Sequence, residues 1–125
     1  MLEDIELRKR DFIRRFNEIL SACPKPLPPL KALLVKTLMS KAPGYYISYD
    51  YARRLLRLYR RKMLPASYNP LRYKMISEIA RRVDEIKKSN TSHAEGRALT
   101  RVLVQGNASR FFISLPTATR IINSK

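Results

Sequence analysis

The chain has 125 residues, and its 26 lysines and arginines outnumber its 10 aspartates and glutamates, which gives a formal net charge of +16. Its single cysteine, Cys23, excludes an internal disulfide, and no apolar run approaches the roughly 20 residues that a helix needs to cross a bilayer. The charged start, Met1 to Asp4, argues against a secretory signal, so we expect a cytoplasmic protein with no membrane partner.

The excess of basic residues indicates a polyanionic partner. Repulsion among so many like charges destabilises a compact chain, and binding a polyanion offsets it. Nucleic acid is the usual partner for such a composition. Arginine is more frequent than lysine in this chain, and its planar guanidinium matches phosphates and base edges. The alternatives are a basic surface that is only solvated, or attachment to an anionic membrane surface.

The first half of the chain is expected to contain three helices. Apolar residues recur at helical spacing in the ranges 3–21, 30–41 and 49–62. The proline-rich segment 23–29 cannot be helical and separates the first two helices. Ser48 is a good helix cap and predicts where the third helix begins.

The second half is expected to contain three more helices in the same order. The same spacing predicts helices over 70–88, over 97–105 and from Ser114 onward. Ser92 and Glu95 have the spacing of a capping box, in which both side chains bind the N–H groups of the first helical turn. This box is expected to open the fifth helix.

The two halves are related by an internal repeat. Residues 31–59 align with residues 97–125 without a gap, and identical or similar residues recur along the alignment. The preceding segments align as well, 11–19 with 78–86. Such self-similarity indicates two copies of one helical unit.

We therefore predict an all-α protein of about six helices, formed by tandem duplication of a three-helix unit. The first repeat would be 1–65 and the second 66–125. Because a unit of this size is marginally stable alone, the two repeats are expected to share one compact core.

Short aromatic runs occupy equivalent positions in the two copies. They are Tyr45–Ile47 and Phe111–Ile113, and both favour extended structure. A two-fold relation between the copies would bring them together as a small antiparallel pair. Their aromatic rings either pack on the core or stack on bases. We favour core packing, because both copies keep the rings but only one keeps the hydroxyl groups.

The strongest candidate for a binding surface is the basic face expected on the helix over 49–62. Its members are Arg53, Arg54, Arg57, Arg60, Arg61 and Lys62. The equivalent helix of the second copy keeps only Arg120, so the repeat itself does not require this charge. Such a run is either a solvated helix face or a surface that contacts phosphates. The net charge of the chain favours phosphate contact.

Six further residues are candidates for contacts with nucleic acid. They are Tyr49, Tyr51, Arg14, Arg15, Arg81 and Arg82. The two tyrosines occur in one copy only, so the shared fold does not account for them. The arginine pairs recur in both copies, each about one turn before a glutamate (Glu18 or Glu85). These arginines either form ion pairs within their helix or contact phosphates.

The sequence offers little for catalytic chemistry. His93 is the only histidine and lies at an expected helix start, and Cys23 has no neighbouring base to activate it. The carboxylates do not follow the spacing of a metal site. We therefore expect no enzymatic activity, no cofactor and no bound metal.

The sequence favours a non-catalytic protein that binds DNA or RNA, mainly through backbone phosphates. The alternative is a helical accessory subunit that docks on an enzyme, or associates with itself, within a nucleoprotein complex. Its interface would be apolar and would include Leu7, Leu58, Met63 and Leu64.

Overall fold

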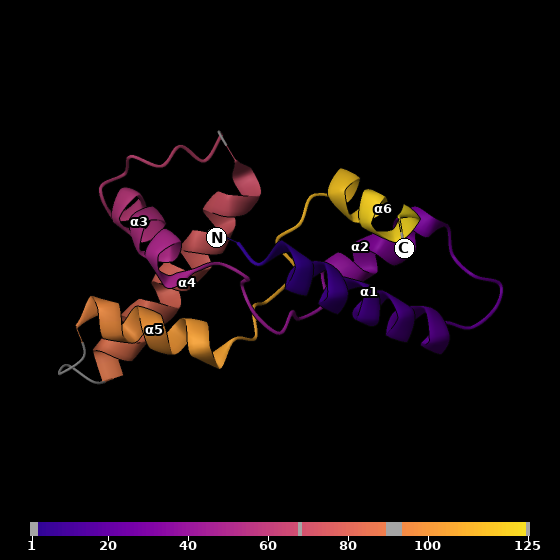
Figure 1. The fold of residues 1–125 in the computed structure, drawn as a ribbon, viewed down its shortest axis with the longest axis horizontal. Helices are drawn as coiled ribbons and strands as arrows, with labels where there is room; N and C mark the ends of the chain where they lie inside the picture. Colours follow the sequence, from indigo (N-terminus) through magenta and orange to yellow (C-terminus); the bar gives the residue numbers. More distant parts are fainter. Residues whose placement is uncertain (1–2, 68, 90–93, 125) are drawn as a thin grey trace. The chain divides into compact units, whose positions relative to one another are not determined.

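A computed structural model describes residues 3–67, 69–89 and 94–124 (Figure 1). Within these residues the chain forms six α-helices and no strand, which confirms the all-α prediction. The helices are α1 (Ile5–Ala22), α2 (Leu30–Leu38), α3 (Tyr49–Arg60), α4 (Pro70–Ser89), α5 (Glu95–Gln105) and α6 (Leu115–Asn123).

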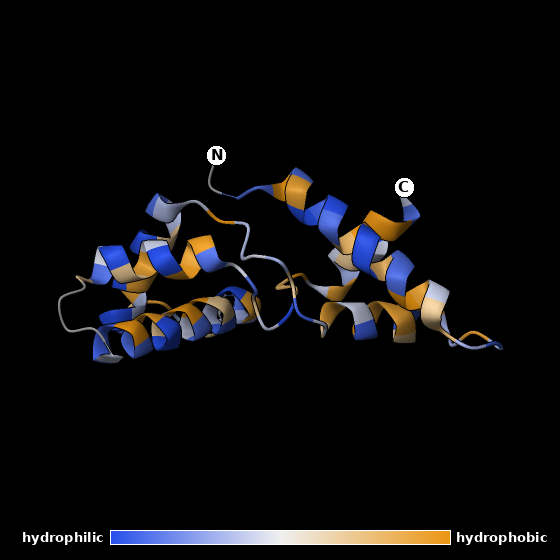
Figure 2. Cartoon of the chain, turned by 90° about the horizontal axis from the view of Figure 1, so that it is seen from below, coloured by the Kyte–Doolittle hydropathy of each residue, from blue (hydrophilic) through white to orange (hydrophobic). Residues whose placement is uncertain are grey.

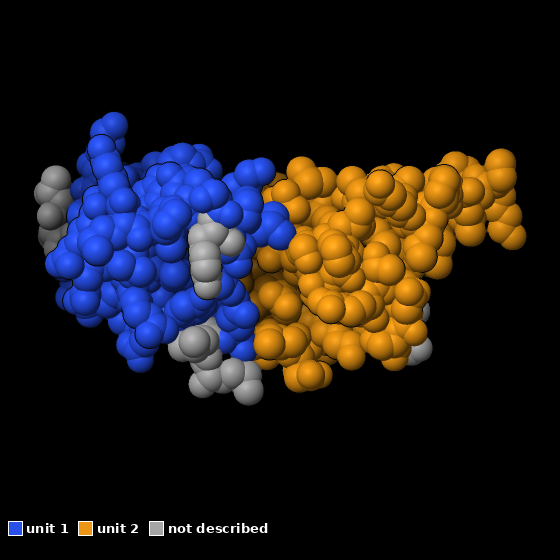
Figure 3. Space-filling model, turned by 90° about the horizontal axis from the view of Figure 1, so that it is seen from above, with its two compact units in different colours: residues 1–3, 47–106 blue, residues 4–46, 107–125 orange. Residues whose placement is uncertain are grey.

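The described helices form two compact units, coloured separately in Figure 3. Residues 47–106 with Glu3 form one unit, in which α3, α4 and α5 pack on one another. Residues 4–46 and 107–125 form the other, from α1, α2 and α6. We call them the α3–α5 unit and the α1–α2–α6 unit. Each unit draws helices from both halves of the chain, so its limits differ from those of the predicted repeats.

Polar side chains cap α3, α4 and α6, and two of these caps are the serines at which the sequence predicts a helix start. Ser48 Oγ accepts a hydrogen bond from the Tyr51 N–H at 3.2 Å, and Ser114 Oγ accepts one from the Thr117 N–H at 3.3 Å. The two serines have nearly the same backbone angles, φ −71° and ψ 156° against φ −72° and ψ 154°. Asn69 Oδ1 caps α4 in the same way, at 3.1 Å. These bonds satisfy N–H groups that have no partner inside the helix.

Two helix ends differ from the expectation. The fifth helix begins at Glu95 with Ala94 as its N-cap and no side-chain cap, so Glu95 is not the third residue of a capping box. Ser92 lies outside the described residues. The second helix ends at Leu38, because the backbone there changes to a tighter turn with bonds between residues three apart. The Ser40 N–H and Oγ both donate to the Thr37 carbonyl, at 3.1 and 2.6 Å.

The core of the α3–α5 unit is aliphatic, and Figure 2 shows apolar and polar residues sharing each helix. Its buried residues are Ala52, Leu55, Leu56, Met75, Ile76, Ile79, Ala80, Val83, Ala98, Leu99 and Val102. Each fully buried leucine, isoleucine, valine or methionine side chain contributes about 1.5–3 kcal/mol to folding. This core holds α3 with its apolar face inward and its arginines outward.

The core of the α1–α2–α6 unit contains the repeated aromatic rings. Phe12 meets Phe111 edge-on at 5.3 Å between ring centroids, and Tyr45 stacks on Phe112 at 6.3 Å. Tyr45 and Phe111 are buried. This arrangement is the core packing that the sequence favoured for these rings.

The predicted strand pairing of the two aromatic runs is wrong among the described residues. The antiparallel bridge that links these regions lies earlier in the chain, between Ala42 and Ala108. Ile47 instead forms a bridge with Glu3. Tyr46 has a positive φ of 60°, which breaks the extended conformation that a strand requires. The rings therefore meet by stacking, without a β-ladder.

Candidate functional site

A pocket of about 410 Å³ opens in the α3–α5 unit, where α3 faces the end of α4 and the start of α5. We call it the basic pocket. Among the described residues, five cationic side chains and a single carboxylate line it. The lining residues are Arg53, Arg57, Arg60, Arg61, Lys87, Glu95, Gly96 and Leu99. The pocket therefore attracts anions.

Helical spacing explains why the pocket is so rich in arginine. Arg53, Arg57 and Arg60 follow one another at intervals of four and three residues, which places them on one face of α3. The other face carries the buried Leu55 and Leu56. Arg53, Arg57 and Arg61 are exposed, and their mutual repulsion would be relieved by an anion.

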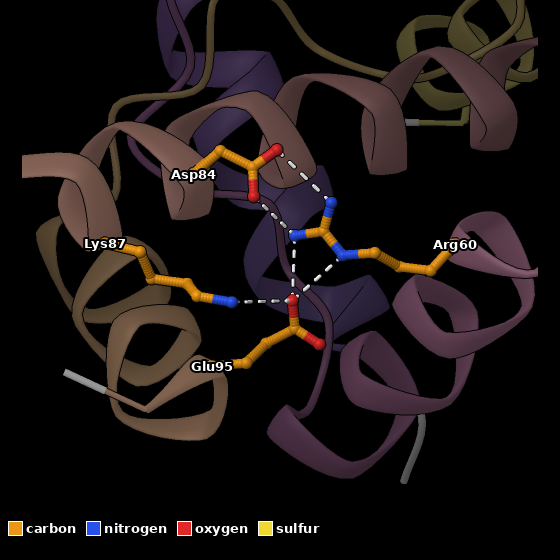
Figure 4. A network of polar contacts seen from close by, with 4 residues as sticks. All are labelled: Arg60, Asp84, Lys87 and Glu95. Atoms are coloured by element: carbon orange, nitrogen blue, oxygen red, sulfur yellow. Dashed lines mark hydrogen bonds and ion pairs between the residues drawn. The ribbon is translucent and has the colours of Figure 1, made fainter. Parts of the chain in front are cut away.

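Arg60 differs from the other arginines because two carboxylates hold it (Figure 4). Its guanidinium donates to Asp84 at 2.7 and 3.2 Å and to Glu95 Oε1 at 2.9 Å, and its Nη2 also forms an ion pair with Glu95 Oε1 at 2.8 Å. Lys87 Nζ also lies 3.8 Å from Glu95 Oε1. The hydrogen bonds to Asp84 raise the pKa of Arg60; burial opposes this shift, and the bond to Glu95 adds to it. Arg60 therefore ties α3 to α4 and α5 as a permanent cation.

Tyr49 lies beside two residues that line the basic pocket, Arg53 and Gly96. Its hydroxyl lies 3.4 Å from Arg53 Nη1. The same oxygen lies 2.6 Å from the position that a Cβ would take at Gly96, which is closer than a side chain tolerates. Gly96 therefore leaves room for the Tyr49 hydroxyl beside the first turn of α5.

Tyr51 and Arg54 lie outside the residues that line the basic pocket. Two guanidinium groups lie over the Tyr51 ring, Arg54 at 5.3 Å and Arg72 at 5.5 Å from its centroid. Arg72 also bonds Glu3 at 3.2 Å. Lys62 is exposed, with a positive φ of 57°, just after the end of α3. Tyr51 is thus held by contacts within the protein.

The four recurring arginines of α1 and α4 have partners within the chain. Arg15 pairs with Glu18 at 3.3 Å and Arg81 with Glu85 at 3.6 Å, as the intrahelical interpretation predicted. Arg14 lies 3.9 Å from Asp11. Arg82 donates to the carbonyl of Gly106 at 3.2 Å. Arg14 and Arg15 of α1 belong to the α1–α2–α6 unit, whereas the other ten candidates belong to the α3–α5 unit.

A second cavity runs along α4. It has a volume of about 930 Å³, and we call it the α4 groove. Its lining residues are Tyr59, Tyr73, Lys74, Ser77, Glu78, Ala80, Arg81, Asp84, Glu85, Lys87 and Lys88. Tyr59 and Tyr73 contact each other at 5.5 Å between ring centroids, with their planes tilted by 57°. Lys87 lines both this groove and the basic pocket.

Sequence reasoning missed several of these residues. Lys87 and Glu95 join the pocket from α4 and α5, and no local pattern links them to α3. Neither Tyr59 nor Tyr73 is among the residues that the sequence singles out as candidates. The sequence signal for the two tyrosines is that both stand near basic residues. Their helices, α3 and α4, pack together in the structure.

The apolar residues proposed for a protein interface are divided between the two units. Met63 is 63% exposed, whereas Leu58 and Leu64 are half-buried. Leu7 belongs to the α1–α2–α6 unit.

The described residues contain no group of three His, Cys, Asp or Glu side chains that could hold a metal ion. None of their helices has the length and apolar character to cross a membrane. Comparisons with models of protein families, with curated proteins and with solved structures found no match.

Proposed function

We propose that this protein binds DNA or RNA through backbone phosphates in the basic pocket and performs no chemistry on it. The observation that carries the proposal is the grouping of three exposed arginines, Arg53, Arg57 and Arg61, around one cavity. A guanidinium offers a planar fork of N–H donors that fits a phosphate.

The charge balance of the pocket supports the same proposal. Its carboxylate, Glu95, is bonded to Arg60 and lies near Lys87, so its charge is partly offset. The whole chain also carries a formal charge of +16. A phosphate bound here releases condensed counterions from nucleic acid, which drives association at low salt.

A filter-binding comparison tests the proposal. Duplex DNA, single-stranded DNA and a structured RNA would be titrated with the wild type and with the triple variant R53Q/R57Q/R61Q. We expect the triple variant to weaken binding to every nucleic acid that the wild type binds, because phosphate contacts do not depend on sequence. Glutamine preserves helix propensity, so the fold should persist.

A matched variant controls for net charge. The triple variant K31Q/K36Q/R101Q removes the same charge from exposed positions outside the basic pocket. It should retain most of the affinity. Equal losses in both variants would show that binding depends on total charge alone and would contradict a specific pocket. If the wild type binds no nucleic acid but a sizing run shows self-association, the accessory-subunit alternative would be preferred.

We also propose that the chain arose by tandem duplication of a three-helix unit and that the two copies exchange their third helices. In support, α3 packs with α4 and α5, whereas α6 packs with α1 and α2. The matching caps of Ser48 and Ser114 add to this support. An experimental structure should superpose the two units with Ser114 on Ser48; different helix orders in the two units would contradict the exchange.

A further inference from the structure

We propose that the α4 groove accepts an unpaired base, so that the preferred ligand is a single strand of nucleic acid. This inference rests on the proposed function: the phosphates of the strand bind in the basic pocket, and one of its bases binds in the α4 groove. The groove, at about 930 Å³, has ample room for a nucleobase.

The aromatic end of the groove supplies a surface for stacking. Tyr59 of α3 and Tyr73 of α4 line it, and both residues are half-buried. Contact between the rings, at 5.5 Å, and the 3.3 Å bond between the Tyr59 hydroxyl and Ser77 Oγ hold the pair in place. Rings held in this way lose little freedom when a base stacks on them, which favours binding.

The charges along the groove suit a strand that carries phosphates. Three carboxylates line the groove, Glu78, Asp84 and Glu85. Asp84 is paired with Arg60, and Glu85 is paired with Arg81, so two of the three are partly neutralised. Lys74 and Lys88 are exposed and also line the groove. Cations beside an aromatic pair are typical of sites that bind single strands.

The groove and the basic pocket are adjacent along one helix face. Tyr73, Ser77, Ala80, Asp84 and Lys87 recur every three or four residues and so share one face of α4. The helical rise places Lys87 roughly 21 Å from Tyr73 along the axis. Lys87 and the Arg60–Asp84 pair belong to the region where the cavities meet. One strand can therefore place phosphates in the pocket and a base at the tyrosines.

A duplex cannot use this arrangement fully, because its bases are already stacked and paired. Stacking a base on an aromatic side chain is worth about 1–3 kcal/mol when the ring is removed. It also tolerates any base, since every base has a π-face. The groove thus predicts a preference for single strands without strong sequence selectivity.

Fluorescence anisotropy with a labelled single strand and with a duplex of the same sequence tests the inference. In the variant Y73L, leucine retains helix propensity and apolar contact with Tyr59 but removes the ring. We expect Y73L to weaken single-strand binding about fivefold to a hundredfold and to change duplex binding less than about twofold. F112L is the control, because the Phe112 ring stacks on Tyr45 and lines neither cavity, and it should preserve the preference for single strands.

Three outcomes separate the inference from the proposed function. Unchanged single-strand affinity in a folded Y73L protein, or equal loss on both ligands, overturns the inference but leaves phosphate binding intact. Binding of neither ligand by the wild type overturns both proposals. Photo-crosslinking of a 5-iodouracil strand to the wild type gives a second readout that does not depend on the fold of the variant. Crosslinks at Tyr59 or Tyr73 support the inference, and crosslinks confined to other residues contradict it.

Discussion

Arg60 of α3 and Asp84 of α4 face each other through two hydrogen bonds, of 2.7 and 3.2 Å, in a bidentate pair. Glu95 of α5 accepts from the same guanidinium. A single arginine thus connects all three helices of its unit. The arginines of this face of α3 therefore have different roles. Arg60 stabilises the fold, whereas the neighbouring arginines remain accessible to a ligand.

The first prediction concerns stability. R60Q should lower the free energy of unfolding by about 1 kcal/mol, because it removes a bidentate pair whose geometry is good but whose carboxylate, Asp84, is exposed to solvent. R57Q, on the exposed side of the same helix, should change it by less than about 0.5 kcal/mol. Urea denaturation followed by circular dichroism measures both values. Equal effects of the two substitutions would show that the Arg60 network does not stabilise the unit.

The second prediction concerns the carboxylate of the basic pocket. E95Q removes this negative charge while leaving an amide oxygen that can still accept from Arg60. Two unit charges about 4 Å apart in water interact by roughly 1 kcal/mol, so E95Q should tighten polyanion binding about fivefold at low salt. The gain should shrink as salt screens the charge. Weaker binding by a folded E95Q protein would mean that Glu95 chiefly positions Arg60 for the ligand.

The third prediction concerns the α1–α2–α6 unit. The Tyr46 hydroxyl donates to Asp11 Oδ2 at 2.8 Å, and Asp11 is only 7% exposed. Y46F leaves a buried carboxylate oxygen without this donor and should lower the free energy of unfolding by about 1–3 kcal/mol. Thermal or urea unfolding at neutral pH measures the loss.

The pH dependence of this contact follows from the same geometry. Burial, and then the bond to Asp11, raise the pKa of Tyr46 above its ordinary value of 10.0. The folded state therefore holds this proton more tightly than the unfolded chain does. The contribution of Tyr46 is complete below pH 10 and declines as pH rises above it. The difference in stability between wild type and Y46F should narrow above pH 10; a constant difference would contradict the raised pKa.

Local patterns predicted the helices but not their partners. Apolar spacing placed all six helices close to where they occur, and Ser48 and Ser114 marked two of their starts. The same spacing says that Leu55 and Leu56 of α3 face a core, but it cannot say which helices supply that core. The partners of α3 depend on tertiary packing, which a one-dimensional pattern does not contain.

For the candidate site, the sequence likewise predicted the residues of one helix but not their partners on other helices. The arginine face of α3 was visible in the sequence because its spacing is local. The role of Arg60 was not, because its partners Asp84 and Glu95 are far away in the chain. The spacing between Ser92 and Glu95 predicts that Glu95 caps a helix. In the folded protein Glu95 instead accepts a hydrogen bond from Arg60. Long-range ion pairs of this kind leave no periodic signal.

The salt dependence of binding tests the central claim most directly. The affinity for a duplex and for a single strand would be measured across a series of salt concentrations for wild type, R53Q/R57Q/R61Q and K31Q/K36Q/R101Q. Each lost phosphate contact reduces the log–log slope by roughly 0.9 on duplex DNA and 0.7 on single strands. We predict that the pocket variant flattens the slope by roughly two to three units on the duplex, whereas the matched control changes it by less than about one. An unchanged slope in the pocket variant, with affinity retained, would show that the arginines of α3 do not contact phosphates.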